Sequence, residues 1–332
     1  MRQACVIFAG CLAVAACAKA PPSIDPRDPA SPLQLERRIS LPGVSGRIDH
    51  LALDESGQRL FVAEVANGTV DEVDLVHGTL LGRIGSLKEP QGVAYLPDRD
   101  EVAVASGDGH VRFFSAADRR LVTDIDLGDD ADDVRTDPQS GHALVGYGSG
   151  GIAEIDPATH KLVGRLMLTG HPEGFQSTGM RLFVNVPDRG IIVSADANRR
   201  RVDSSWPTGL RRLNFPMALS AEGKRLFVVY RLPATIVALD PATGAELFAR
   251  ATCGDSDDVY AQGGRLYVVC GAGHVDVMRE DDGQPIARVA TAPGARTGLI
   301  SARSNKLYVA APAHGGDAAI LAFRISPGKP VR

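Results

Sequence analysis

A short hydrophobic motif recurs seven times in this chain at nearly constant spacing. Most copies join a basic or polar residue, an aliphatic residue, an aromatic residue or valine, a valine and a small residue, as in Arg59–Ala63 and Arg181–Asn185. The central valines occupy positions 62, 104, 145, 184, 228, 268 and 309, so consecutive copies lie 39 to 44 residues apart. A period of about 40 residues is typical of a chain built from stacked copies of one supersecondary unit.

Each period contains four segments with the composition of β-strands. In the first period they are 48–53, 59–64, 70–75 and 80–84, and turn residues such as Asp, Asn and Gly separate them. No segment carries a long apolar pattern of helical period. The chain is 44% hydrophobic and 23% charged, which is ordinary for a soluble globular protein. Four short antiparallel strands repeated seven times predict an all-β fold, a seven-bladed β-propeller over residues 34–327.

The last period supplies only three strands, near residues 298–301, 307–310 and 319–324. At the other end of the chain, Leu35–Leu41 precedes the first full period and matches the fourth-strand segments of later periods. We expect this N-terminal strand to complete the seventh blade, because an unpaired strand edge invites aggregation. Residues 328–332 then form a short tail.

The N-terminal residues resemble a bacterial export signal. The apolar run Val6–Ala16 is too short for a membrane-spanning helix, which needs about 20 residues, but it has the length of a signal-peptide core. It ends in Val14-Ala15-Ala16-Cys17, which resembles the lipobox of bacterial lipoproteins. We therefore predict a signal peptide over residues 1–16 and a lipid on Cys17. An ordinary secretory signal cut after Ala15 or Ala16 is the alternative.

Residues 17–33 contain five prolines, which favour an extended tether between the lipid and the propeller. Ala18 follows the cysteine, where aspartate would mark retention in the inner membrane. The resemblance to lipoproteins therefore implies the periplasmic face of the outer membrane. Without the lipid, the protein would be periplasmic.

Six further segments recur where one period passes into the next. They are Gln91–Ala94, Asp130–Arg135, His171–Gln176, Asn214–Ala218, Gly254–Asp258 and Gly294–Thr297. Together with the repeat, they resemble the YVTN-type propeller repeat and, more closely, the YncE-like family of secreted bacterial propellers. The resemblance covers residues 34–327 and implies the fold, but the family supplies no agreed reaction. One class of members is associated with single-stranded DNA, and the net charge of −4 argues against a nucleic-acid partner for this chain.

These links also carry the candidate functional residues. In a propeller, the first strand of each blade lines a central channel, and the links between blades open on one rim. We expect the following residues at the mouth of this channel: Asp49, His50, Gln91, Asp132, Asp133, His171, Glu173, Asn214, Asp257, Asp258 and Arg296. Six carboxylates then face one arginine and two histidines, which favours a cation, a cationic ligand or an ordered water column.

Two functions from different classes fit this rim. In the first, the ring is a binding platform that recognises a small molecule, a peptide or an envelope protein, and acts as a monomer that reaches the membrane only through its lipid anchor. In the second, it is a metal-dependent hydrolase that resembles the gluconolactonase-type propellers in architecture. Its oxygen ligands for Ca²⁺ or Mg²⁺ would be Asp133, Glu173, Asn214 and Asp258. The general base would then be His50 or His171. A quinone or haem oxidoreductase is the least favoured class, and no Cys-x-x-Cys-His motif for covalent haem is present.

Two cysteines remain if the signal peptide is removed and Cys17 carries lipid. A turn at residues 262–264 would place Cys270 opposite Asp255 or Ser256, close to Cys253. Disulfides form and persist in the oxidising periplasm. We therefore predict a Cys253–Cys270 disulfide at the channel rim. The alternative is that Cys270 is a small buried residue that ends its strand.

Overall fold

The computed structural model describes residues 21–56, 58–148 and 150–327. The predicted signal peptide and Cys17 lie outside these residues. Within the described ranges, no helix is both long enough and apolar enough to cross a membrane.

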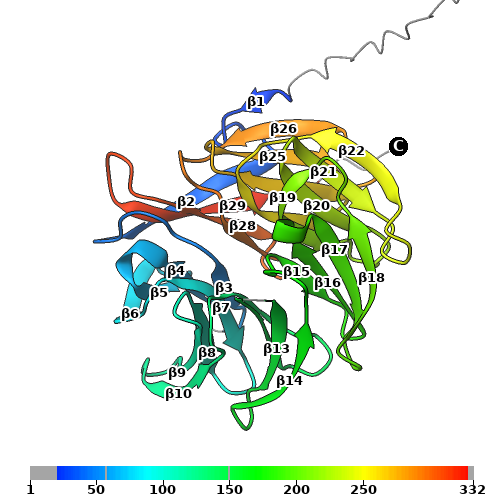
Figure 1. Ribbon diagram of the computed structural model, residues 1–332. Helices are drawn as coiled ribbons and strands as arrows, with labels where there is room; N and C mark the ends of the chain where they lie inside the picture. Colours follow the sequence, from blue (N-terminus) through cyan, green and yellow to red (C-terminus); the bar gives the residue numbers. More distant parts are fainter. Residues whose placement is uncertain (1–20, 57, 149, 328–332) are drawn as a thin grey trace, which may run out of the picture.

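The chain forms a seven-bladed β-propeller, as predicted. Seven antiparallel sheets surround a common axis, and the colours of Figure 1 pass around the ring in sequence order. The first strand of each blade is the innermost one, because these strands contact the corresponding strands of neighbouring blades. The described residues contain no α-helix, and the single-turn 3₁₀ helices are η1 (Val65–Asn67) and η2 (Pro187–Arg189).

The first three blades each use four consecutive strands. Blade 1 contains β3 (Leu51–Asp54), β4 (Arg59–Glu64), β5 (Thr69–Asp74) and β6 (Thr79–Ile84). Blade 2 contains β7 (Pro90–Leu96), β8 (Glu101–Ser106), β9 (His110–Ser115) and β10 (Leu121–Asp126). Blade 3 contains β11 (Ala131–Thr136), β12 (Ala143–Tyr147), β13 (Gly151–Asp156) and β14 (Lys161–Met167).

The next two blades repeat this arrangement. Blade 4 contains β15 (Phe175–Ser177), β16 (Arg181–Val186), β17 (Ile191–Asp196) and β18 (Arg201–Pro207). Blade 5 contains β19 (Arg212–Leu219), β20 (Leu226–Leu232), β21 (Ala234–Leu239) and β22 (Glu246–Ala251).

The last two blades include strands from the N-terminal part of the chain. Blade 6 contains β23 (Ser256–Gln262), β24 (Arg265–Cys270), β25 (His274–Arg279) and β26 (Pro285–Ala290), with β1 (Ser23–Ile24) as a fifth strand. Blade 7 contains β27 (Gly298–Ser301), β28 (Lys306–Ala311) and β29 (Ala318–Ile325), with β2 (Leu33–Leu41) as its outer strand.

Strand β2 closes the ring. It pairs antiparallel with β29, so that Leu35 lies opposite Phe323 and Leu41 opposite Ala318, and Figure 1 shows blue β2 beside red β29. Leu33, Ile39 and Leu41 are buried by this pairing. The predicted closure by an N-terminal strand is therefore confirmed.

The chain just before β2 also lies on the propeller. Ser23 and Ile24 pair parallel with Arg288 and Val289 at the outer edge of blade 6. The backbone N–H of Arg288 donates to the carbonyl of Pro22 at 2.8 Å. The end of the segment that the sequence predicts as a tether is thus bound to blade 6, where it covers an exposed strand edge.

The hydrophobic core is divided among the blades. Each of the seven interfaces between neighbouring blades has its own cluster of buried side chains. The valines of the repeat are fully buried in these clusters, as Val62, Val145 and Val228 illustrate. A single four-stranded blade cannot bury both of its faces, so stacking into a ring supplies the core.

Candidate functional site

A recurring irregularity places the polar residues on the axis of the ring. At the start of the inner strand, the register with the second strand shifts between residues 90 and 93, 131 and 134, 214 and 217, and 256 and 258. Such β-bulges bend the strand and redirect side chains. In blades 3 and 6, they bring two consecutive aspartates to the centre of the ring.

The side chains that meet there form a charged cluster, which we call the hub. Its carboxylates are the six that the sequence predicts: Asp49, Asp132, Asp133, Glu173, Asp257 and Asp258. Its other groups are His50, His171 and Arg296, together with three arginines that the sequence analysis did not assign to the rim: Arg47, Arg135 and Arg231. Four guanidinium groups therefore face the six carboxylates, and the predicted acidic funnel is a cluster of mixed charge.

Ion pairs connect most of the hub. Arg47 donates to Asp49 at 2.6 Å, and Arg135 donates to Asp133 at 2.8 Å. Arg231 of blade 5 donates to Asp257 of blade 6. The Asp49 and Asp133 side chains are only 2% and 5% exposed, so these carboxylates depend on their arginines for compensation of charge.

His50 lies where blades 1, 3 and 6 meet. Its Nδ1 atom is 3.8 Å from Oδ1 of Asp258, whose Oδ2 accepts a hydrogen bond from the backbone N–H of Gly298 at 2.9 Å. Burial of the imidazole opposes protonation, but the carboxylates of Asp133, Asp49 and Asp258 outweigh it and raise the pKa of His50 to about 9. Burial raises the pKa of Asp49 to about 7 and that of Asp258 to about 6.

A second group of ligand atoms lies between blades 3 and 4. Asp132, His171 and Glu173 each offer one atom within 4.8 Å of the other two, and the His171 Nε2 and Asp132 Oδ2 atoms are 3.8 Å apart. His171 Nδ1 lies 2.9 Å from the carbonyl oxygen of Gly148, which fixes Nδ1 as the donor. The neighbouring Asp132 carboxylate raises the pKa of His171 to about 9, and burial raises the pKa of Glu173 to about 8.

The hub leaves little free space. Arg47, His50, Arg135, Glu173 and Phe215 help to line a cavity of about 30 Å³. That volume is close to the share of one molecule in liquid water. This cavity can therefore hold a water molecule or a monatomic ion.

Five predicted rim residues do not line this cavity: His171, Asp258 and Arg296 still belong to the hub, whereas Asn214 and Gln91 do not. Asn214 is fully buried, and its Nδ2 group donates to Oδ1 of Asn185 at 3.0 Å and to the carbonyl oxygen of Ile191 at 3.1 Å. Gln91 donates to Oδ1 of Asp130 at 3.0 Å, and its backbone carbonyl accepts from the N–H of His50. Both residues join neighbouring blades through these donors, while Oδ1 of Asn214 is buried with no hydrogen-bond partner among the described residues.

The structure does not assemble the predicted ligand set of Asp133, Glu173, Asn214 and Asp258. Asp133 pairs with Arg135, Asp258 accepts from Gly298, and Asn214 lies among the blades. Only Glu173 belongs to the group of atoms that approach one another closely. The repeat places these four residues at equivalent positions of their blades. Which of their oxygen atoms approach one another depends on the β-bulges and on pairing with the arginines.

The two predicted general bases carry a charge at neutral pH. With a pKa of about 9, both His50 and His171 are imidazolium ions at pH 7. A general base must accept a proton, which the imidazolium form cannot do. The hub therefore favours an electrostatic role for these histidines.

The predicted Cys253–Cys270 disulfide is present. The two Cα atoms are 5.9 Å apart, and Cys270 lies opposite Ser256 in the β23–β24 register. The bridge connects the end of β24 to the link that precedes β23. It therefore supports the backbone that carries Asp257 and Asp258 into the hub.

The same face of the ring carries exposed leucines that the sequence analysis did not single out. Leu210, Leu213 and Leu232 are 91%, 42% and 62% exposed, and we call them the leucine patch. Leu232 lies beside Leu213, because the register of β19 and β20 pairs Leu232 with Arg212, the residue that precedes Leu213. Leu213 has a φ angle of 60°, a left-handed conformation that is uncommon for a residue with a branched side chain. No periodic signal marks these leucines, because they lie in a link and at strand ends.

Comparisons with known proteins agree with the fold. Residues 188–331, less than half of the chain, match the family model of the outer membrane protein assembly factor BamB. A solved chain of hydrazine synthase from Kuenenia stuttgartiensis superposes with a TM-score of 0.73 at 15% identity, covering 87% of this chain and 99% of that chain. No curated protein matches the sequence. The class defined by the fold and the hub is a β-propeller with a closed, charged centre.

Proposed function

We propose that this protein is a protein-binding scaffold of the bacterial cell envelope, and that the leucine patch contacts its partner. The observation that carries the proposal is the contrast between the centre and the surface of one face. The cavity found among the hub side chains measures about 30 Å³, whereas Leu210, Leu213 and Leu232 project from the face around it. A partner that binds this face meets leucines before it meets the channel.

The leucine patch has the features of a contact surface. Neighbouring exposed apolar side chains beside charged groups are typical of protein interaction sites. Arg231, next to Leu232, instead turns to the hub, where it pairs with Asp257 and stacks over the ring of Phe215 at 4.0 Å. The strand that displays Leu232 is thereby fixed to the rigid centre, so the patch is preorganised for binding.

The envelope location rests on the N-terminal sequence, the disulfide and the partial match to an outer membrane assembly factor. We propose that Cys17 carries the lipid and that the protein works at the periplasmic face of the outer membrane. A disulfide suits an oxidising compartment. The BamB description also supports a partner that is itself an envelope protein.

Site-specific photocrosslinking in the native host tests this proposal. A photoreactive amino acid at position 210 should form a defined adduct with one envelope protein. The matched control is position 121, because Leu121 is 46% exposed on the outer strand of blade 2, away from the patch. Leu232→Asp should reduce the adduct at position 210 at least fivefold. Equal adducts at positions 210 and 121, or none at 210, would rule out the leucine patch as the contact.

Cation binding at the hub is a second candidate function. Asp132, His171 and Glu173 bring three ligand atoms together. Since Nδ1 of His171 is already a donor, Nε2 is the ligand atom, and the ion must displace the proton that the imidazolium form carries there. Such an ion would connect the start of β11 in blade 3 to the link that precedes β15 in blade 4, and would thereby stabilise the hub. Metal analysis of purified protein should find one divalent ion that Glu173→Gln removes and Glu101→Gln, outside the hub, does not. Protein free of metal in both cases would eliminate this candidate.

A further inference from the structure

The interface between blades 3 and 4 contains a cavity on the face opposite the hub. Its volume is about 120 Å³. The apolar part of its walls is formed by the buried side chains of Leu144, Ile152, Leu166 and Leu182, and the polar part includes Asp137, Glu154 and Arg200. Its mouth lies among the turns that join the first to the second strand and the third to the fourth. A cavity of 150 Å³ with apolar walls is known to hold benzene, so this one has the size of a small ring or a branched aliphatic group.

The interface between blades 1 and 2 shows why the cavity exists. There, Glu72 accepts from Arg59 at 3.3 Å and from Arg119 of the next blade at 2.6 Å. In the blade 3–4 interface, Glu154 lies 2.7 Å from Nδ1 of His142 and accepts from Arg200 of the next blade at 2.9 Å. Each interface therefore has the same polar frame, a glutamate held by one basic side chain of its own blade and by one arginine of the next blade.

The two interfaces differ in what fills that frame. Between blades 1 and 2, the rings of Phe61 and Tyr95 stack with their centroids 5.8 Å apart. The residues at the same strand positions between blades 3 and 4 are Leu144 and Ser177. The loss of two aromatic rings without a replacement leaves the cavity, although protein interiors are normally close-packed.

The mouth of the cavity has unused hydrogen-bonding groups. Gln139 and Asn198 are exposed there, and among the described residues their side-chain amides make no hydrogen bond. Amides of this kind can both donate to and accept from a peptide backbone. Beside the mouth, Met180 adds an apolar side chain that is 66% exposed.

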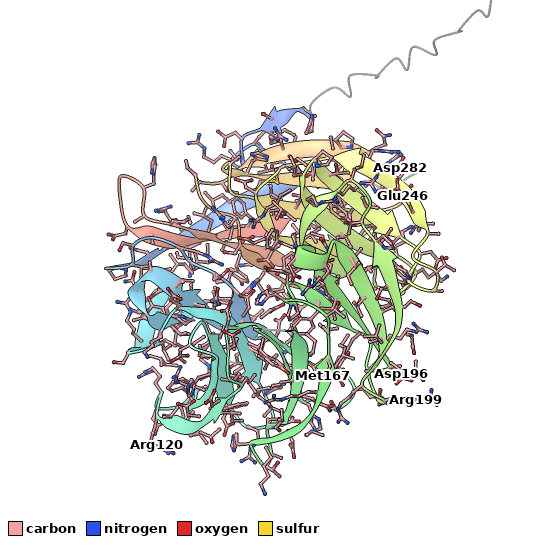
Figure 2. The ribbon with its side chains drawn as sticks, in the orientation of Figure 1. Arg120, Met167, Asp196, Arg199, Glu246 and Asp282 are labelled. Carbon is pink, nitrogen blue, oxygen red and sulfur yellow. A yellow bond between two sulfur atoms is a disulfide. The ribbon has the colours of Figure 1, made fainter. Side chains whose placement is uncertain are left out.

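Beside the mouth, the positively charged side chains are more exposed than the negatively charged ones. The side chains of Arg199 and Arg201 are 73% and 66% exposed, while their partners Asp196 and Asp203 are 23% and 26% exposed. The carboxylates of Asp137 and Glu154 are already engaged by Ser177 and Ser140 and by Arg200 and His142, respectively. Figure 2 shows Asp196 and Arg199 together at the outer edge of the ring. A ligand that approaches this edge meets guanidinium groups first, which favours acidic groups beside its apolar anchor.

We infer that this cavity is a peptide-binding pocket, which takes one phenylalanine or leucine side chain from an extended, acidic segment of a partner protein. The apolar walls receive the side chain, the amides of Gln139 and Asn198 bind the adjacent backbone, and Arg199 and Arg201 attract the acidic residues. The pocket lies on the opposite face from the leucine patch, so the two contacts are independent.

Methyl NMR of protein with labelled methionines tests the inference. The probe is the synthetic peptide Gly-Asp-Phe-Asp-Glu-Gly, and its control has alanine in place of phenylalanine. The phenylalanine peptide should shift the methyl signal of Met180 in a saturable manner, and the alanine peptide should bind at least tenfold more weakly. Met167 is the internal reference, because it is 64% exposed and its sulfur accepts from Tyr147 on the other face of the sheet.

Two sets of variants separate the pocket from its surroundings. Leu144→Phe should fill the cavity and abolish the Met180 shift, whereas Val163→Phe adds the same ring at an exposed site and should leave binding unchanged. If Leu144→Phe fails to fold, the double variant Gln139→Ala and Asn198→Ala, at exposed positions, should weaken binding at least threefold. A Met180 shift that persists unchanged in the folded variants would overturn the inference.

Three further outcomes would point to a different occupant of the pocket and would also contradict the inference. A Met180 shift with benzyl alcohol but not with the peptide would mean that the pocket takes free small molecules. A shift that depends on protein concentration alone would mean that a second copy of the chain occupies it. Equal affinity for Gly-Lys-Phe-Lys-Lys-Gly would overturn the requirement for acidic flanking residues.

Discussion

The hub and the leucine patch lie on the same face of the propeller and have opposite compositions. At the hub, Asp133 and Asp258 are each 4% exposed as whole residues, although both are carboxylates. In the patch, Leu210 is 91% exposed, although leucine is usually buried. The difference shows that charge pairing orders the centre of this face, while apolar side chains are exposed on the surface around it.

Selection for folding stability alone would favour neither buried carboxylates at the hub nor exposed leucines in the patch. Well-packed apolar residues can replace a buried ion pair with no loss of stability. Leucines in water contribute no burial energy, which is about 25 cal/mol for each Å² of apolar surface removed from water. The comparison therefore predicts that hub variants change the free energy of unfolding, and that patch variants change binding.

The largest effect is expected from the disulfide that supports the hub. The double variant Cys253→Ser and Cys270→Ser should lose about 3 kcal/mol of unfolding free energy, because the bridge closes a loop of sequence separation 17. Urea denaturation measures the loss. Dithiothreitol should lower the stability of the wild type by the same amount and leave the double variant unchanged; a wild type insensitive to reductant would show that the bridge does not support the fold.

The next effect concerns an ion pair inside the hub. Arg135→Met should lower the free energy of unfolding by about 2 kcal/mol, because it leaves Asp133 buried without its cation. The loss stays below the ~3–5 kcal/mol of a fully buried pair because the Arg135 side chain is 31% exposed.

Arg201→Met is the matched control for Arg135→Met. Arg201 pairs with Asp203 on an exposed strand, and its loss should cost less than about 0.5 kcal/mol. Equal losses of unfolding free energy in the two variants would mean that the ion pair in the hub contributes no more to stability than an ion pair on the surface.

The pH dependence of stability tests the charge state of the hub. The folded-state pKa of His50, about 9, lies above its ordinary value of 6.5, so its stabilising effect is complete below pH 6.5 and disappears as the pH rises through 9. Between pH 7.5 and 9.5, the wild type should lose about 2 kcal/mol from this residue.

In His50→Gln, the decrease over the same pH range should be correspondingly smaller. The raised pKa values of Asp49 and Asp258, about 7 and 6, act in the same direction but below this range. Denaturation at the two pH values, with Leu210→Ser as the control, measures the difference. A pH profile identical in all three proteins would contradict the assignment.

The smallest effect on stability is expected in the leucine patch. Leu210→Ser and Leu232→Ser should each change the free energy of unfolding by no more than about 0.5 kcal/mol, because both side chains are exposed. Thermal unfolding measures this change. A loss above 1 kcal/mol would show that these leucines stabilise the fold, and would contradict the predicted difference between the leucine patch and the hub.

The repeat made the fold predictable. Seven valines at nearly equal spacing specified the blades, and the unmatched Leu35–Leu41 segment specified how the ring closes. The two cysteines were also predictable, since a turn of known position brought them to one rim. These inferences depend on local pattern and on pairing about a turn, which the sequence encodes directly.

The candidate site was only partly predictable. Asp132 and Asp133 were recognised from their phase in the repeat, but phase does not show that Arg135 pairs with Asp133 or that Asn214 turns away from the channel. Arg135 could have been noticed, since residues two apart on a strand share a face. Arg231 had no such signal, because its partner Asp257 belongs to another blade.

The repeated strand pattern was enough to predict a closed ring of seven blades with polar residues at its centre, because strand patterns and turns are local along the chain. It did not predict which charges meet or how little space they leave. Nor did it predict that Leu144 and Ser177 stand where another interface has two stacked rings. Contacts between side chains of different blades depend on bulges, twist and packing, which appear only when the whole ring is assembled.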